Sequence, residues 1–245
     1  MNLTKREVKG RYSQSFFGVA WAIAQPLATM AVFTLVFSRL AKMDSNGAPY
    51  PLFAFAALVP WFFFMNSVSS GTLSLITYRN IVTKTYFPRE IIPLAQVCSR
   101  FIDFFAAAAL YVLLMTVYGV GIGVWSLMAP VFFLLLILFT VGLTFATSAM
   151  NVFYRDVSPV VQIGLQLWLY VTPIAYPLDK VPPQWRGWIA LNPLTGIVEG
   201  FRSAVVYGRA PDLALVAEAA TLSALTLLAA LILFKRLDKY FADVI

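Results

Sequence analysis

The sequence lacks histidine altogether and contains a single cysteine, Cys98. The absence of histidine removes the commonest metal ligand in proteins and the commonest general base. One thiol forms no internal disulfide, and no cluster of cysteines predicts zinc or a redox pair. The sequence also has no GxSxG motif and no paired carboxylates at a catalytic spacing. We therefore expect no metal site, no cofactor and no covalent chemistry in this chain.

Charged residues are scarce as well. They make up 12% of the 245 residues, whereas 60% are hydrophobic and the mean hydropathy is +0.80. A soluble domain carries roughly twice that charged fraction. The net charge of +7 comes from short basic runs between apolar segments, a pattern that records orientation in a membrane. These features predict an all-α integral membrane protein that does not bind nucleic acid.

Six apolar segments are long enough, or nearly long enough, to cross the roughly 30 Å hydrocarbon core of a bilayer as helices. The fifth is short and ends in the proline-rich stretch VTPIAYPL, so we expect it to be broken or tilted. The basic stretch TKREVKGRY before the first segment is followed by no cleavage site, so we expect it to be retained. The predicted spans are 19–38, 52–75, 91–118, 127–149, 160–176 and 213–234.

The distribution of Lys and Arg predicts the orientation. Eleven lie on the side that holds both termini, six lie on the other side, and Arg100 falls inside the third span. Both termini are therefore expected in the cytoplasm. The six on the outer side are Arg39, Lys42, Lys180, Arg186, Arg202 and Arg209.

Two segments outside the spans are predicted to have structure of their own. In residues 1–18, apolar Val8, Tyr12 and Phe16 are four apart, which favours an interfacial helix with its basic side toward lipid phosphates. The alternative is an ordinary basic flank without fixed structure. The basic residues that would meet headgroups are Lys5, Arg6, Lys9 and Arg11.

Residues 178–211 contain apolar helical stretches that are too short to cross and are separated by prolines. Non-helical backbone at membrane depth persists only inside protein or beside water. We predict two short re-entrant helices that enter from the outer face. The alternative is an external loop anchored in the interface by Trp185 and Trp188.

Several stretches carry a resemblance to a known family. GVAWAIAQPLATMAVFTLVFSRLA, PYPLFAFAALVPWFFF, NIVTKTYFPREIIPL, NVFYRDV and ALNPLTGIVEGFR occur in the order found in ABC-2 type permeases that export O-antigen, teichoic acid and capsular polysaccharide. The resemblance covers nearly the whole chain, 1–245, as a single transmembrane domain. It implies a homodimer in the bacterial inner membrane, with a path for lipid-linked polysaccharide, carried on polyprenyl pyrophosphate, between the subunits.

The resemblance also implies two copies of a separate ATPase subunit, which would bind ATP and magnesium. This sequence agrees, because it has no GxxxxGK[ST] phosphate loop. Residues 76–90 resemble the coupling helix that contacts the ATPase in this family. The expected contact residues are Arg79, Asn80, Lys84, Tyr86, Arg89 and Glu90.

Charged residues within apolar segments are costly and usually face protein or water. Arg100 and Asp103, three apart on one helix face, predict a mutual ion pair or a contact with the lipid pyrophosphate. Glu199 and Arg202 have the same spacing within the re-entrant segment, and we expect them to form an external gate.

Aromatic residues make up 16% of the chain. Sugars present apolar CH faces that stack on rings, so a path for glycans should be lined with them. Interfacial belts and lipid-facing phenylalanines explain the same abundance, and the sequence does not separate the two. The candidates for the channel are Phe16, Trp21, Trp61, Phe62, Tyr170 and Tyr176.

Three other functions are compatible with a multi-pass membrane protein. An ion-coupled transporter would have buried carboxylates and an internal repeat. Asp103 alone supports this class only weakly, and the sequence shows no internal repeat. A membrane enzyme predicts clustered acidic residues or histidines, which are missing. An ABC-2 permease for a drug or small lipid shares the fold, and only the resemblance favours polysaccharide.

Overall fold

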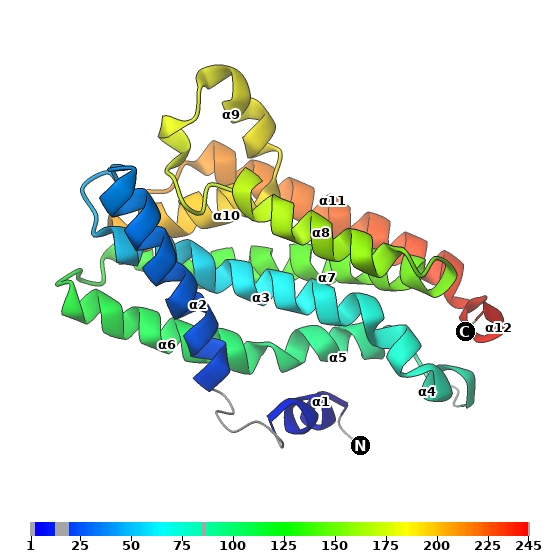
Figure 1. Cartoon of the computed structure of the whole chain (residues 1–245). Coiled ribbons are helices and arrows are strands. Elements are labelled where there is room, and N and C mark those ends of the chain that lie inside the picture. The colour runs from blue at the N-terminus through cyan, green and yellow to red at the C-terminus, as the bar shows by residue number, and fades with distance from the viewer. Residues whose placement is uncertain (1–2, 13–19, 85–86, 245) are drawn as a thin grey trace.

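The structure, a computed structural model, describes residues 3–12, 20–84 and 87–244. In this part of the chain all regular structure is helical, which confirms the predicted all-α class. Phe16 and Tyr86, two of the candidate residues, lie outside the described ranges, as do the side chains of Arg11 and Lys84. Figure 1 shows most of the long helices lying side by side along one direction, with α2 (Ala20–Phe33) crossing them steeply and the connections gathered at the two ends.

Five helical segments of the described chain are long and apolar enough to cross a membrane. Two of them contain a short π-helical or 3-10 stretch, and the third is interrupted at Arg100. They are α2 with η1 (Ala20–Phe33, Thr34–Leu40), α3 (Tyr50–Thr77), α5 with α6 (Ile91–Ser99, Phe101–Val117), η2 with α7 (Val124–Met128, Ala129–Phe153) and α11 (Leu213–Asp238).

The predicted count of six spans is not confirmed. The expected fifth span forms α8 (Val157–Val171), a helix of 15 residues that is about 22 Å long. Thr172 caps it in an extended conformation, because the proline at position 173 disfavours helical backbone in the residue before it. The chain then continues as the irregular segment 172–177.

Helix α3 is the centre of the bundle, and α2, α5, α6, α7 and α8 all pack on it. Small residues let the central helices approach closely. A side chain at Gly71 of α3 would collide with Thr144 of α7, and a Cβ on Gly142 would lie 2.9 Å from the backbone of Leu227 in α11. Rings fill the remaining space, as where Phe64 stacks on Phe139 at 5.4 Å.

A buried polar cluster joins three of these helices. The hydroxyl of Thr72 in α3 donates to Thr147 Oγ1 in α7 at 2.8 Å. Asn151, near the end of α7, donates to the Thr72 carbonyl at 3.1 Å and accepts from the backbone N–H of Ser158 in α8. Because its two bonds reach two different helices, Asn151 fixes the start of α8 relative to α3 and α7.

The two ends of the bundle differ in structure. One end carries the connections 41–49, 118–123 and 172–212, including η3 (Leu178–Lys180), α9 (Pro183–Ala190), α10 (Pro193–Phe201) and η4 (Arg202–Val206). The segment 178–211 thus contains two short helices, as predicted, while their re-entrant position in a membrane stays a prediction. The other end carries α4 (Arg79–Lys84) and α12 (Phe241–Val244).

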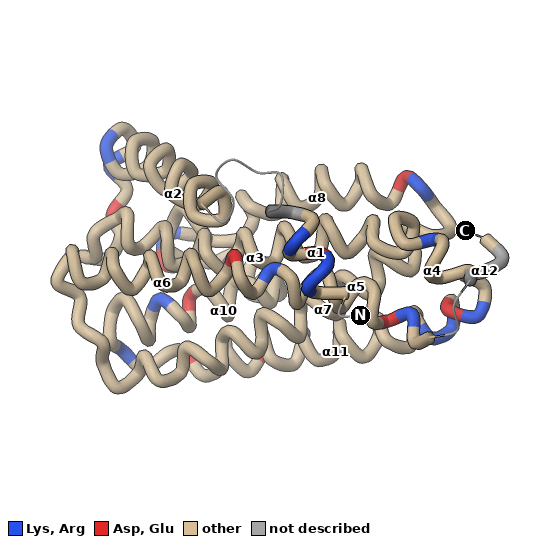
Figure 2. The backbone as a smooth tube through the Cα atoms, turned by 90° about the horizontal axis from the view of Figure 1, so that it is seen from below, with Lys and Arg blue, Asp and Glu red and all other residues tan. Residues whose placement is uncertain are grey.

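The N-terminal helix α1 (Leu3–Tyr12) packs on α5. Its inner residues Leu3, Glu7 and Val8 are partly buried, whereas Lys5 and Lys9 are exposed. A helix was predicted over 1–18, and the structure has it over 3–12. Figure 2 shows basic residues along α1 and at the end that carries α4 and α12.

Candidate functional site

Helix α3 is buried on most of its surface but open along one stripe. The side chains of Phe62, Met65, Asn66, Ser69 and Ser70 are partly exposed, whereas their neighbours are buried. Their spacing of three or four residues places them on one face. Helices α2 and α8 both pack on α3 and lie on the same side of the bundle (Figures 1 and 2).

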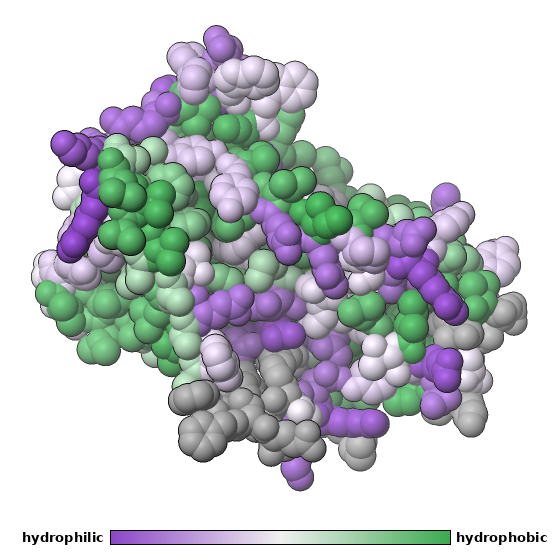
Figure 3. Space-filling view, viewed as in Figure 1, coloured by the Kyte–Doolittle hydropathy of each residue, from purple (hydrophilic) through white to green (hydrophobic). Residues whose placement is uncertain are grey.

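These two helices present polar side chains of their own. On α8, Gln162, Gln166 and Tyr170 are exposed and four residues apart, so they form one row. On α2, Trp21 and Gln25 have the same spacing and are exposed. Figure 3 shows hydrophilic residues gathered across the middle of this side, in the region between α2 and α8. We use the name polar face for six neutral polar residues of these three helices: Gln25, Asn66, Ser69, Ser70, Gln162 and Gln166.

The polar face carries amides and hydroxyls but no formal charge. Amides and hydroxyls both donate and accept hydrogen bonds, so the face matches a solute rich in neutral hydroxyl groups. Its four amides were not among the residues predicted from the sequence. The signal was available, since uncharged amides at a spacing of four, such as Gln162 and Gln166, are unusual in an apolar span.

The structure separates the six aromatic candidates. Trp21 and Tyr170 are 58% and 66% exposed beside the polar face, and Phe62 lies on the open stripe of α3. Trp61 is instead buried in the core, 5.7 Å from the ring of Phe64. The hydroxyl of Tyr176 donates to the backbone carbonyl of Tyr170 at 3.0 Å, which ties the segment after α8 back to that helix.

Arg202 is fully buried at the end of the bundle that carries α9 and α10. Its guanidinium donates to the carbonyls of Phe53, Pro173 and Ile174 at 3.1, 2.5 and 2.6 Å. It also pairs with Glu199 at 2.9 Å and lies 3.5 Å above the ring of Phe53. One side chain therefore joins three segments, namely η4, α3 and residues 173–174.

Two tyrosines strengthen the same end. Tyr50 donates to the carbonyl of Ala175 at 2.8 Å, and Tyr207 donates to the carbonyl of Ser45 at 2.9 Å. Burial raises the pKa of Tyr207 to about 12, so its hydroxyl keeps the proton that it donates. The predicted pairing of Glu199 with Arg202 is present, and the role of the pair as a gate stays a prediction.

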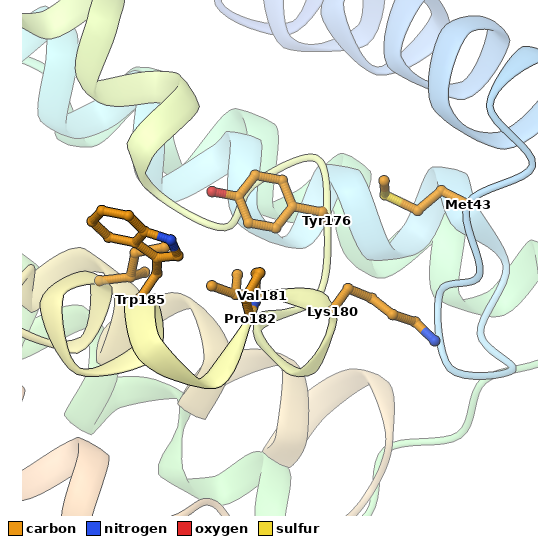
Figure 4. Close-up of a pocket in the computed structure, with 7 residues that line it drawn as sticks. Met43, Tyr176, Lys180, Val181, Pro182 and Trp185 are labelled. Carbon is orange, nitrogen blue, oxygen red and sulfur yellow. The ribbon is translucent and has the colours of Figure 1, made fainter.

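An apolar pocket of about 350 Å³ lies at this end, between the segment 176–189 and the connection 41–49. Figure 4 shows Tyr176, Val181 and Trp185 grouped together, while Lys180 extends toward the connection that holds Met43. The ammonium of Lys180 is 3.8 Å from the carboxylate of Asp44, and this exposed ion pair links the two segments beside the pocket.

Arg100 lies at the break between α5 and α6, and its guanidinium is 3.4 Å from the carboxylate of Asp103. Both side chains are more than four-fifths buried. The ion pair predicted from their spacing is therefore present. A contact with a lipid pyrophosphate stays a prediction.

At the opposite end, the expected ATPase contacts divide into two sets. Arg79 and Asn80 of α4 are exposed. Arg89 and Glu90 instead form ion pairs within the chain, with Asp238 and Lys235 of α11. Contact of any of these residues with an ATPase stays a prediction.

Comparison with known proteins identifies the family. Residues 1–206 match the model of the ABC-2 type transporter family. The chain is 32% identical over 249 residues to the O-antigen export system permease protein RfbA of Myxococcus xanthus, covering 99% of this chain and 94% of that one. It is 30% identical to RfbA of Klebsiella pneumoniae, covering 84% of this chain and 79% of the relative. It is 24% identical to the polysialic acid transport protein KpsM of Escherichia coli, covering 83% and 79%. With its bundle of apolar helices, the chain belongs to the ABC-2 type transporter family.

Proposed function

We propose that this chain is the membrane subunit of an ATP-driven exporter that moves lipid-linked polysaccharide across the bacterial inner membrane. The observation that carries the proposal is the polar face, a set of neutral amides and hydroxyls on three helices that are otherwise largely apolar. The names of the relatives, which are export proteins for O-antigen and polysialic acid, support polysaccharide as the cargo.

Polar groups turned toward lipid are unfavourable, because hydrocarbon offers them no hydrogen bonds. A second copy of the chain, with its polar face toward the first, removes the amides from lipid and encloses a path between the two. Neutral hydrogen-bonding groups suit a sliding polymer, since strong charged sites would hold it in place. Trp21 and Tyr170, exposed at the edge of the face, supply rings for the apolar faces of sugars.

A separate ATPase supplies the energy in this proposal, and the transport subunit does no chemistry. The exposed side of α4, with Arg79 and Asn80, is the surface proposed to contact the ATPase. Helix α4 follows α3 after a single residue, Tyr78. Because α3 carries Asn66, Ser69 and Ser70, a displacement of α4 along the axis of α3 reaches the polar face directly.

The ends of the chain are assigned in the same proposal. The termini, α4 and α12 are cytoplasmic, and α9 and α10 face outward, where Glu199 and Arg202 hold the mouth of the path. This orientation agrees with the basic residues, because one of the six on the outer side, Arg202, is buried and contributes nothing to surface charge. Exposed Lys5, Arg6 and Lys9 of α1 would meet anionic lipid, including the pyrophosphate of the carrier.

The test uses the subunit reconstituted with the ATPase of the same organism in proteoliposomes. Transfer of a fluorescent polyprenyl-pyrophosphate-linked oligosaccharide is measured together with ATP hydrolysis. We expect wild-type protein to export the probe, and the double variant Gln162→Leu/Gln166→Leu to lose most export. The matched control is Leu167→Ala, which changes an exposed residue on another side of α8.

Two results would overturn the proposal. Failure of the wild-type subunit to form a complex that hydrolyses ATP would exclude the ATP-driven class. Unchanged export by the glutamine double variant would show that the polar face is not the path.

A further inference from the structure

Two ion pairs link the C-terminal end of α11 to the connection that follows α4, although about 150 residues separate these segments in sequence. Arg89 Nη1 lies 3.1 Å from Asp238 Oδ1, and the same nitrogen donates to the Asp238 backbone carbonyl. Beside this pair, Glu90 forms an ion pair with Lys235. The carboxylate side chain of Glu90 is only 17% exposed.

An apolar cluster underlies these pairs. Val82, on the inner side of α4, is 2% exposed, and Phe234 and Phe241 are fully buried. The rings of Phe234 and Phe241 are 5.3 Å apart, and Phe234 also lies 5.3 Å from Phe145 of α7. Helix α12 packs on α4. The inner side of α4 is therefore part of one packed unit with the end of α11.

Helix α4 has six residues, which is too short to be stable without tertiary contacts. It begins after Tyr78, whose hydroxyl bonds to Glu7 of α1. Its orientation therefore depends on what packs around it, and Phe234 and Phe241 of the C-terminal segment belong to the same apolar cluster as Val82. Arg89 and Glu90 were expected to contact the ATPase, whereas in the structure both form ion pairs with α11.

We propose that residues 234–244 form a clasp that positions α4 for the ATPase, with Arg89–Asp238 and Glu90–Lys235 as its two positioning pairs. The inference rests on the proposed function and adds to it a route for the mechanical signal. A displacement of α4 passes to α11 through the clasp, as well as to α3 through the chain. Each segment contributes one positive and one negative residue to the two pairs. The pairs therefore also fix the register between the two segments.

The clasp is tested by charge exchange in the intact complex with the ATPase. The variants are Arg89→Asp, Asp238→Arg and the double variant that carries both. The matched control is Arg236→Asp, a change at an exposed position on the same turn of α11. The readout is the number of fluorescent lipid-linked oligosaccharides exported per ATP hydrolysed, measured only on complexes that elute as a single species.

We expect each single variant to lower this ratio about fivefold or more, the range of typical coupling between sites. The double variant should recover most of the wild-type ratio, and Arg236→Asp should leave it unchanged. A purely structural pair would change the amount of assembled complex but leave export per ATP in the surviving complex unaltered. If Arg89→Asp yields too little complex to assay, Arg89→Gln removes the charge without placing two carboxylates together.

Two outcomes would overturn the clasp. One is a normal ratio of export to ATP hydrolysis in Arg89→Asp and Arg89→Gln. The other is a double variant that exports no better than the single ones. Either outcome counts against the clasp only when the wild-type complex hydrolyses ATP and exports the probe. A wild-type complex that does neither would refute the proposed function itself, so the two failures are distinguishable.

Discussion

Replacement of Arg202 by methionine is the most severe test of the end of the bundle that carries α9 and α10. Methionine fills a similar volume but offers no donors, so the carbonyls of Phe53, Pro173 and Ile174 lose their partner. Glu199, whose side chain is only 17% exposed, is left without its counterion. Removal of one partner of a buried ion pair costs about 3–5 kcal/mol.

In a chain of this size, 1 kcal/mol corresponds to a shift of about 2–4 °C in the melting temperature. The variant is therefore expected to unfold about 10 °C below wild type. Thermal unfolding of the purified protein in detergent, followed by the fluorescence of its six tryptophans, measures this shift. Arg209→Met is the control, because Arg209 is exposed at the same end, and it should change the melting temperature by no more than about 1 °C.

A double variant separates the contribution of the ion pair to stability from that of the carbonyl contacts. In Glu199→Leu/Arg202→Met no unpaired carboxylate remains, so the double variant should be about 1–3 kcal/mol more stable than the sum of its single changes predicts. If Arg202→Met unfolds at the same temperature as Arg209→Met, Arg202 does not hold η4, α3 and residues 173–174 together, and the role given to it here is wrong.

Three further predictions follow from the packing and the hydrogen bonds. Asn151→Leu leaves the Thr72 carbonyl and the Ser158 N–H without their partner and should cost about 2 kcal/mol, with faster amide exchange at the start of α8; unchanged exchange there would contradict the role of Asn151. Gly142→Ala places a methyl group 2.9 Å from the Leu227 backbone and should destabilise by about 1–3 kcal/mol, whereas Gly164→Ala, in open space, should be neutral or slightly stabilising in the same melting assay. Because burial raises the pKa of Tyr207 from 10.0 to about 12, this tyrosine stabilises the fold below pH 10 and the contribution is lost as the pH rises toward 12; Tyr207→Phe should remove that part of the alkaline destabilisation, and identical pH profiles for the two proteins would refute the assignment.

Local contacts were predictable from the sequence because helix geometry determines them. The pairs Arg100–Asp103 and Glu199–Arg202 are each three residues apart, and both are present. The length of the fifth predicted span was overestimated, because apolar residues continue beyond the proline at position 173, where helical geometry ends. Hydropathy counts the apolar residues and does not register the change of backbone.

Contacts between distant segments were not predictable. No local pattern relates Arg89 to Asp238, and both read equally well as surface charges of a cytoplasmic loop and tail. The burial of Trp61 but not Phe62 was equally inaccessible, because α3 is apolar around most of its circumference and its open stripe is defined only by the helices packed on it. The row of Gln162, Gln166 and Tyr170 is different, since its spacing of four was readable and its polarity was overlooked.

The connections of α3 and α8 explain how a push at one end can alter the polar face. Helix α3 is held between its neighbours by close contacts such as Gly71 against Thr144, so α3 and α7 form one closely packed unit. The start of α8 is fixed to that unit by the bonds of Asn151, while most of its length is exposed. If α4 contacts an ATPase as proposed, we expect its displacement to be taken up between α3 and the exposed length of α8, the two helices that carry most of the polar face. The separation of Gln162 and Gln166 from Asn66 is then the distance expected to change when the ATPase closes.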